Sequence, residues 1–192
     1  MKKGDDLYVK RFLLILCAAS ALAVFGAPAE GKKPSALVVF YSWSDAGNTR
    51  ILARMIAEKT GADLEELVME KPYPRVYRQV LAQGRKDLEK DLPVPLKKLK
   101  KNPAGYRTVF VGTPIWFATY APPVRTFLRE NDLSGKTVIF FCTHGRGGPG
   151  HFFADARKLC PKALPGKDFS CYGTHIKKIG PRVDAWIKEN TK

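Results

Sequence analysis

The chain has 192 residues, 45% of them hydrophobic, so it is long enough to bury the core of one ordinary domain. Its 33 Lys and Arg residues outnumber its 18 Asp and Glu residues, giving a net charge of +15. Such an excess either forms only a solvated surface or attracts an anionic partner: an acidic redox protein, a phosphorylated dinucleotide or a membrane surface. Nucleic acid is not expected as a partner, because no aromatic and basic recognition motif accompanies the charge.

The first 29 residues have the organisation of a secretory signal. Two basic residues precede the apolar run Phe12 to Phe25, and the small-x-small sequence Ala27-Pro28-Ala29 follows it as a cleavage site. We therefore expect residues 1–29 to be a signal peptide, residues 30–192 to form the domain, and the protein to be exported, either to the periplasm or out of the cell. A retained membrane anchor is the alternative, although the apolar run is short for a bilayer span.

Strand-like and helix-like segments alternate through the rest of the chain. This alternation predicts an α/β domain in which helices cover both faces of a parallel sheet. The five predicted strands are Ala36–Tyr41, Leu64–Val68, Thr108–Gly112, Thr137–Cys142 and Phe169–Gly173. The five predicted helices are Thr49–Lys59, Tyr77–Lys90, Pro123–Asn131, Phe152–Leu159 and Pro181–Glu189.

A hydroxyl-rich loop joins the first predicted strand to the first predicted helix. A helix N-terminus leaves its first N–H groups unpaired and carries a partial positive charge, so an anion binds there favourably. We therefore predict a phosphate site formed by Ser42, Trp43, Ser44, Gly47, Asn48 and Thr49. The alternative is a polar turn in which Asn48 or Thr49 only caps the helix.

The loop after the third predicted strand places two aromatic residues next to a proline. A flat ligand ring with an apolar face and a hydrogen-bonding edge needs an aromatic wall and several backbone N–H groups. We predict that this loop supplies them through Pro114, Ile115, Trp116 and Phe117, with Trp116 as the wall. The alternative is that Trp116 and Phe117 only cap the core.

The loop after the fourth predicted strand is rich in glycine, and we assign Thr143, His144, Gly145 and Gly148 to the same site. Its G-x-G-x-x-G spacing is a weak dinucleotide fingerprint, because a proline interrupts it and the unit comes late in the sheet. A nucleophilic pair of Cys142 and His144 is disfavoured, because the glycines end the strand before both side chains can face one way. The chain also lacks the G-x-S-x-G elbow of serine hydrolases.

The three loops together resemble those of the flavodoxin family, through the motifs Gly47-Asn48-Thr49, Pro114-Ile115-Trp116 and Phe141-Cys142-Thr143-His144-Gly145. The first loop departs from the family pattern by inserting Asp45-Ala46 before Gly47. The resemblance implies a flavodoxin-like three-layer sandwich with a five-stranded parallel sheet of order 2-1-3-4-5, and flavin mononucleotide (FMN) as the cofactor.

The family includes single-electron carriers and reductases that use NAD(P)H to reduce quinones or similar acceptors. The resemblance thus implies a redox function with a protein partner or a small-molecule acceptor. It implies no catalytic side chain, because the flavin carries the chemistry. The alternative is a flavin-free binding module that keeps the fold.

Three cysteines follow the predicted cleavage site, and none has the spacing of a zinc site. Because an exported protein meets an oxidising environment, we predict a disulfide between Cys160 and Cys171, with Cys142 reduced.

Overall fold

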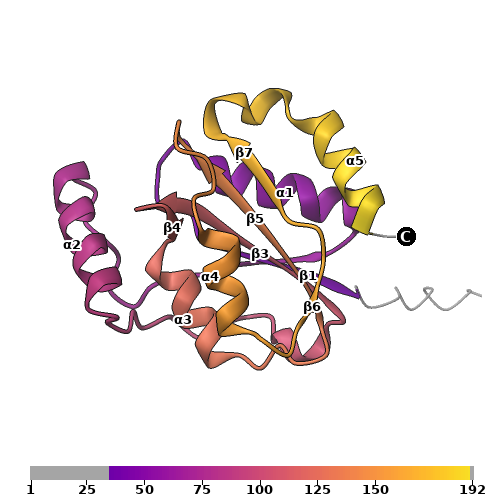
Figure 1. The fold of residues 1–192 in the computed structure, drawn as a ribbon, viewed down its shortest axis with the longest axis horizontal. Coiled ribbons are helices and arrows are strands. Elements are labelled where there is room, and N and C mark those ends of the chain that lie inside the picture. Colours follow the sequence, from indigo (N-terminus) through magenta and orange to yellow (C-terminus); the bar gives the residue numbers. More distant parts are fainter. Residues whose placement is uncertain (1–34, 191–192) are drawn as a thin grey trace, which may run out of the picture. The chain divides into compact units, whose positions relative to one another are not determined.

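A parallel sheet organises residues 35–190, which are the residues that the computed structural model describes (Figure 1). The strand order is β2-β1-β3-β5-β6; in addition β7 lies parallel to β5, and β4 pairs antiparallel with β3. The strands are β1 (Ala36–Phe40), β2 (Asp63–Glu66), β3 (Thr108–Trp116), β4 (Thr119–Tyr120), β5 (Thr137–His144), β6 (Leu164–Pro165) and β7 (Phe169–Tyr172).

Helices form a layer on each face of the sheet, with α1 and α5 on one face and α3 and α4 on the other (Figure 1). The α-helices are α1 (Asn48–Thr60), α2 (Tyr77–Glu89), α3 (Pro122–Glu130), α4 (Phe152–Leu159) and α5 (Gly180–Asn190), and short 3-10 helices span Pro103–Gly105 and Gly173–Lys178. The predicted three-layer α/β fold is thereby confirmed. The predicted signal peptide lies outside the described residues.

Each face of the sheet has its own apolar core, because successive strand residues point to opposite faces. In β1, Leu37 and Val39 join the cluster under α3 and α4, while Val38 and Phe40 join the cluster under α1 and α5. All four side chains are buried, as expected of a strand covered on both faces. Among residues 35–190, no helix is both long and apolar enough to cross a membrane.

The fifth strand position differs from the prediction, because β6 and β7 occupy it as two separate pieces beside β5. Side chains satisfy the backbone at the break. The Phe140 N–H donates to Asp168 Oδ1 over 2.9 Å, and Arg157 donates to the same carboxylate and to the Gly166 carbonyl over 2.7 and 3.1 Å. The chain can therefore leave the sheet between β6 and β7 without leaving buried backbone polar groups unpaired.

We expect Asp168→Ala to lower the free energy of unfolding by about 2 kcal/mol, because it removes the carboxylate that accepts from Arg157 and from the Phe140 N–H. This value is below that for a fully buried pair, since both side chains are partly exposed. Urea unfolding measures it. The control is Asp184→Ala, which removes a surface pair with Lys59 and should cost less than about 1 kcal/mol. Equal losses in the two variants would contradict this account of the break.

The predicted disulfide between Cys160 and Cys171 is wrong. Cys160 packs against the core on the α3 and α4 face, whereas Cys171 belongs to the core on the α1 and α5 face, so the sheet separates the two thiols. All three cysteines among residues 35–190 are free. Burial raises the pKa of the Cys171 thiol to about 11 and raises the pKa of Cys142 further, so both remain protonated at neutral pH.

Candidate functional site

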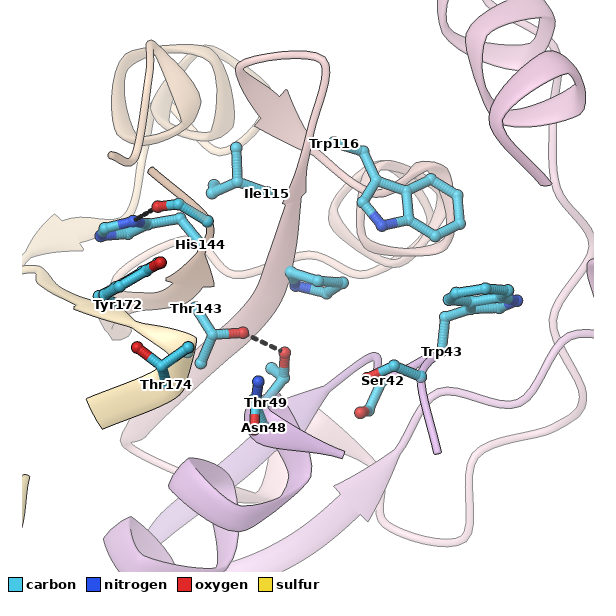
Figure 2. Close-up of a pocket in the computed structure, with 14 residues that line it drawn as sticks. Ser42, Trp43, Asn48, Thr49, Ile115, Trp116, Thr143, His144, Tyr172 and Thr174 are labelled. Atoms are coloured by element: carbon cyan, nitrogen blue, oxygen red, sulfur yellow. Dashed lines mark hydrogen bonds between the residues drawn. The ribbon is translucent and has the colours of Figure 1, made fainter. Parts of the chain in front are cut away.

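A cavity of about 340 Å³ lies at the carboxyl ends of β1, β3 and β5, beside the N-terminus of α1 (Figure 2). In an open parallel sheet this edge is where ligands bind. Eleven of the fourteen residues predicted for the site line it, and three more come from the last residue of β7 and the two residues after it. The lining residues are Ser42, Trp43, Ser44, Asn48, Thr49, Pro114, Ile115, Trp116, Thr143, His144, Gly145, Tyr172, Gly173 and Thr174.

The N-terminus of α1 is open to a ligand. Gly47 precedes the helix with a φ of 59°, a left-handed conformation that glycine adopts without steric cost. No side chain among the described residues caps this end, so the N–H groups of the first turn remain available. Asn48 and Thr49 bring this turn to the cavity, where the helix dipole favours negative charge.

The inserted Asp45 points away from the cavity and is tied to the loop before α2. Arg75 donates to the Asp45 carboxylate over 3.0 Å and to the Trp43 carbonyl over 2.9 Å. The Trp43 indole N–H in turn donates to the Pro74 carbonyl over 3.2 Å. The insertion therefore bulges outward, and Ser42 and Ser44 on its near side still line the cavity.

A hydrogen bond between hydroxyls joins α1 to β5 at the floor of the cavity. Thr49 Oγ1 and Thr143 Oγ1 are 2.7 Å apart, and both residues are buried (Figure 2). One hydroxyl donates to the other, and the one that accepts keeps a proton for a further acceptor. The pair thus presents a fixed donor between two elements that are 94 residues apart in sequence.

Two tryptophans approach one side of the cavity at a steep angle to each other. The ring centroids of Trp43 and Trp116 are 6.4 Å apart, with the planes at 78° (Figure 2). Trp116 also lies against Tyr73, at 5.2 Å between centroids, and packs against the core. Trp116 therefore lines the cavity and also covers the core, and its role as the wall for a ligand ring stays a prediction.

Phe117, Gly47 and Gly148 are the predicted site residues that do not line the cavity. Phe117 and Ala118 form the two-residue tip of the β3–β4 hairpin, with φ of 49° and 64°. The twist of a hairpin requires such positive φ values, and they turn Phe117 away from the cavity. Its ring instead lies 4.8 Å beneath the Arg85 guanidinium.

The lining residues that the sequence analysis missed are Tyr172, Gly173 and Thr174. Tyr172 stacks on His144, with centroids 6.3 Å apart and planes at 23°, and so extends the site from β5 to β7. A Cβ at Gly173 would lie 2.6 Å from Asn48 Nδ2, so glycine lets this segment approach the start of α1. The sequence could have indicated these residues, because the fifth strand of a parallel sheet ends at the same edge as the other strands.

Cys142 and His144 do not form a nucleophilic pair in the cavity. Cys142 is fully buried and does not line the cavity, and burial raises the pKa of its thiol. His144 is partly exposed, and its Nδ1 lies 2.5 Å from the Gly145 carbonyl oxygen. Within residues 35–190, no group of three or more His, Cys, Asp and Glu side chains could hold a metal ion. The groups that line the cavity instead fit an anion together with a flat ring.

Comparison with known proteins agrees with this geometry. A family model described as Flavodoxin matches residues 35–178. A solved structure from Bacteroides uniformis, assigned as a flavoprotein, is 24% identical with a TM-score of 0.70, over 82% of this chain and 99% of that one. A flavoprotein from Lactobacillus acidophilus in complex with FMN is 18% identical with a TM-score of 0.60, over 76% and 97%. No curated protein sequence matches the chain.

Proposed function

We propose that this chain, which belongs to the flavodoxin family, is an exported redox protein that transfers electrons through FMN held in the cavity at the carboxyl ends of β1, β3 and β5. The observation that carries the proposal is the uncapped N-terminus of α1, which faces the same cavity as the two tryptophans. The family and the FMN complex of the Lactobacillus acidophilus flavoprotein both support FMN as the cofactor.

The residues of the cavity fit the two halves of FMN. Ser42, Ser44 and the first turn of α1 would hold the phosphate, because they offer hydroxyl and unpaired N–H donors beside a positive helix end. Trp43 and Trp116 would contact the ring, and the strand ends would meet its polar edge. The bound flavin would supply the uptake and release of one or two electrons, while the protein positions it and sets its potential.

The excess of basic residues between Lys71 and Arg107 favours an anionic donor or acceptor. The segment from Lys71 to Arg107 carries eleven basic residues: Lys71, Arg75, Arg78, Arg85, Lys86, Lys90, Lys97, Lys98, Lys100, Lys101 and Arg107. Of its acidic residues, Asp87 is buried and Asp91 pairs with Arg125 and Arg129. We therefore propose NAD(P)H or an acidic redox protein as the electron donor and a quinone-like compound as the acceptor.

Export is proposed on the sequence of residues 1–29 alone, which has the organisation of a secretory signal. The competing candidate was a flavin-free binding module, and its main support was the insertion in the first loop. Because Asp45 bulges outward, that support is weak. The purified protein should be yellow, or become so when FMN is added. A protein that binds no FMN under any condition would refute the proposed function.

We expect Thr49→Val to raise the Kd for FMN roughly tenfold, because it removes one hydroxyl of the buried pair and leaves Thr143 without its partner. Titration of FMN fluorescence measures the change. The matched control is Thr60→Val in the same helix, whose hydroxyl donates to the Ile56 carbonyl at the far end of α1. The control should bind FMN as the wild type does. If both variants keep the wild-type Kd, the hydroxyl pair has no part in binding.

A further inference from the structure

A second cavity, which we call the basic pocket, lies beside the edge strand β2. Residues of β1, α1, β2 and the segment 97–100 line it, and its volume of about 420 Å³ is within the range of small-molecule sites. It shares no lining residue with the cavity at the carboxyl ends of β1, β3 and β5. One cationic side chain of its lining comes from α1 and three come from the segment: Arg54, Lys97, Lys98 and Lys100.

The segment that carries the three lysines is held against the sheet. Leu96 and Leu99 pack against the core, while the lysines between and after them are exposed. The Lys97 N–H donates to the Val68 carbonyl over 2.7 Å, and Leu96 forms an antiparallel bridge with Met69. The contacts of the backbone and of the two leucines therefore fix where the lysines leave the chain, and all three lysines reach the same pocket.

Two carboxylates also line the basic pocket, but other groups already hold both of them. Glu65 is buried, and its oxygens accept from the backbone N–H groups of Lys100 and Lys101 over 3.1 and 3.0 Å. Glu66 Oε2 accepts from Arg50 Nε over 3.0 Å. In the described part of the chain, by contrast, the four cationic side chains of the pocket have no hydrogen-bond or ion-pair partner. The pocket therefore keeps an excess of positive charge.

The chemistry of the lining indicates which anion fits. Lysine and arginine side chains bind phosphate through charge-assisted hydrogen bonds. A phosphate monoester carries about 1.5 to 2 negative charges at neutral pH and offers three acceptor oxygens, so it balances such a cluster better than a carboxylate with a single charge. The rest of the lining is apolar, and it includes the half-buried Leu64 and Val68, which is 46% exposed. These two side chains would contact the organic group that carries the phosphate.

We propose that the basic pocket binds an organic phosphate, with the four cationic side chains on the phosphate and Leu64 and Val68 against its organic part. The proposal does not rest on the proposed function, because the pocket and the FMN site have separate linings. A soluble phosphate monoester and the headgroup of an anionic phospholipid share this recognition chemistry, and the test distinguishes the two sources.

The test is calorimetric titration of phenyl phosphate into the full chain, once without FMN and once with bound FMN and no excess. Arg54→Gln and Lys98→Gln should each raise the Kd for phenyl phosphate at least about fivefold, because each removes a charge-assisted hydrogen bond. The matched control is Lys90→Gln, which removes the same charge at an exposed residue outside the pocket. It should change the Kd less than about twofold, because salt screens distant charges.

Two further measurements define the ligand. Phenyl sulfate has nearly the same shape but one charge less, so it should bind at least about fivefold more weakly. Sedimentation with phosphatidylcholine vesicles, with and without phosphatidic acid, tests the lipid source. Vesicle binding that requires phosphatidic acid and is weakened in Arg54→Gln and Lys98→Gln would assign the phosphate to a lipid headgroup. Without it, the same variant pattern for phenyl phosphate assigns a soluble compound.

Three outcomes would overturn the proposal, with folding of the variants verified by circular dichroism. They are the absence of binding to both phenyl phosphate and the vesicles, equal changes of Kd in Lys90→Gln and the two pocket variants, and equal affinity for phenyl sulfate and phenyl phosphate. The titration without FMN gives the same comparison, so a failure of FMN binding would refute the proposed function and leave this test intact.

Discussion

Trp116→Ala is expected to weaken FMN binding and to destabilise the fold in the same variant. The ring lines the cavity and also packs against Tyr73 and Gly84, so its removal opens space on both sides. Loss of most of a buried aromatic contact should cost about 1–3 kcal/mol of FMN binding, or roughly 5- to 150-fold in Kd. The free energy of unfolding should fall by about 2–4 kcal/mol, because Trp116 is only partly buried.

The two effects are separated by a control in the other core. Trp186 is 5% exposed and packs against Phe169 and Phe110 on the α1 and α5 face. Trp186→Ala should therefore destabilise the protein by at least as much as Trp116→Ala, yet leave the Kd for FMN unchanged wherever the protein is folded. FMN titration and urea unfolding of both variants give the comparison. Wild-type FMN affinity in folded Trp116→Ala would refute the aromatic wall.

Gly112→Ala is expected to have the largest effect on stability of any conservative change in the sheet. A Cβ at this position of β3 would lie 2.1 Å from the Phe141 ring, and Phe141 is fully buried on β5. Because a packed core rearranges little, the free energy of unfolding of the variant should fall by about 3 kcal/mol or more. The midpoint of urea unfolding measures the loss.

Gly147→Ala is the matched control for this prediction, because a Cβ there meets no atom within 4 Å. It should change stability by less than about 0.5 kcal/mol. A second variant tests the cause directly. Phe141→Leu should relieve the clash, so that Gly112→Ala costs less in its presence than in the wild type, as a double-mutant cycle measures. Simple additivity of the two changes would mean that the ring is not what excludes a side chain at residue 112.

Much of the fold could be predicted from the hydrophobic pattern and from the turn-forming residues at the ends of the elements. Helix α4 has the predicted bounds, α2 ends one residue earlier than predicted, and α1, α3 and α5 differ from the prediction by one residue at each end. The same reasoning could not foresee the two pieces β6 and β7. Their separation depends on Asp168 and Arg157 meeting Phe140 and Gly166 across the sheet edge, and no local pattern encodes such long-range contacts.

The cavity was largely foreseen for a topological reason, since parallel strands bring their following loops to one edge. Two errors at the site and in the core have physical causes. Phe117 was assigned to the cavity, but the two-residue hairpin turn rotates it outward, and nothing in the residues Phe117-Ala118 signals positive φ. The disulfide was assigned from sequence separation, which does not indicate the face of the sheet on which Cys160 and Cys171 lie.

The two outer strands of the sheet bear on whether the sheet can pair edge to edge with another chain. An exposed edge with a long row of free backbone groups is a template for pairing with another chain. On one side the edge is interrupted between β6 and β7, and β6 has two residues, one of them Pro165. On the other side β2 has four residues, and the carboxylate of Glu65 holds the backbone of Lys100 and Lys101 beside it. Within residues 35–190, neither edge offers a long regular strand, so the architecture protects the chain against edge-to-edge aggregation.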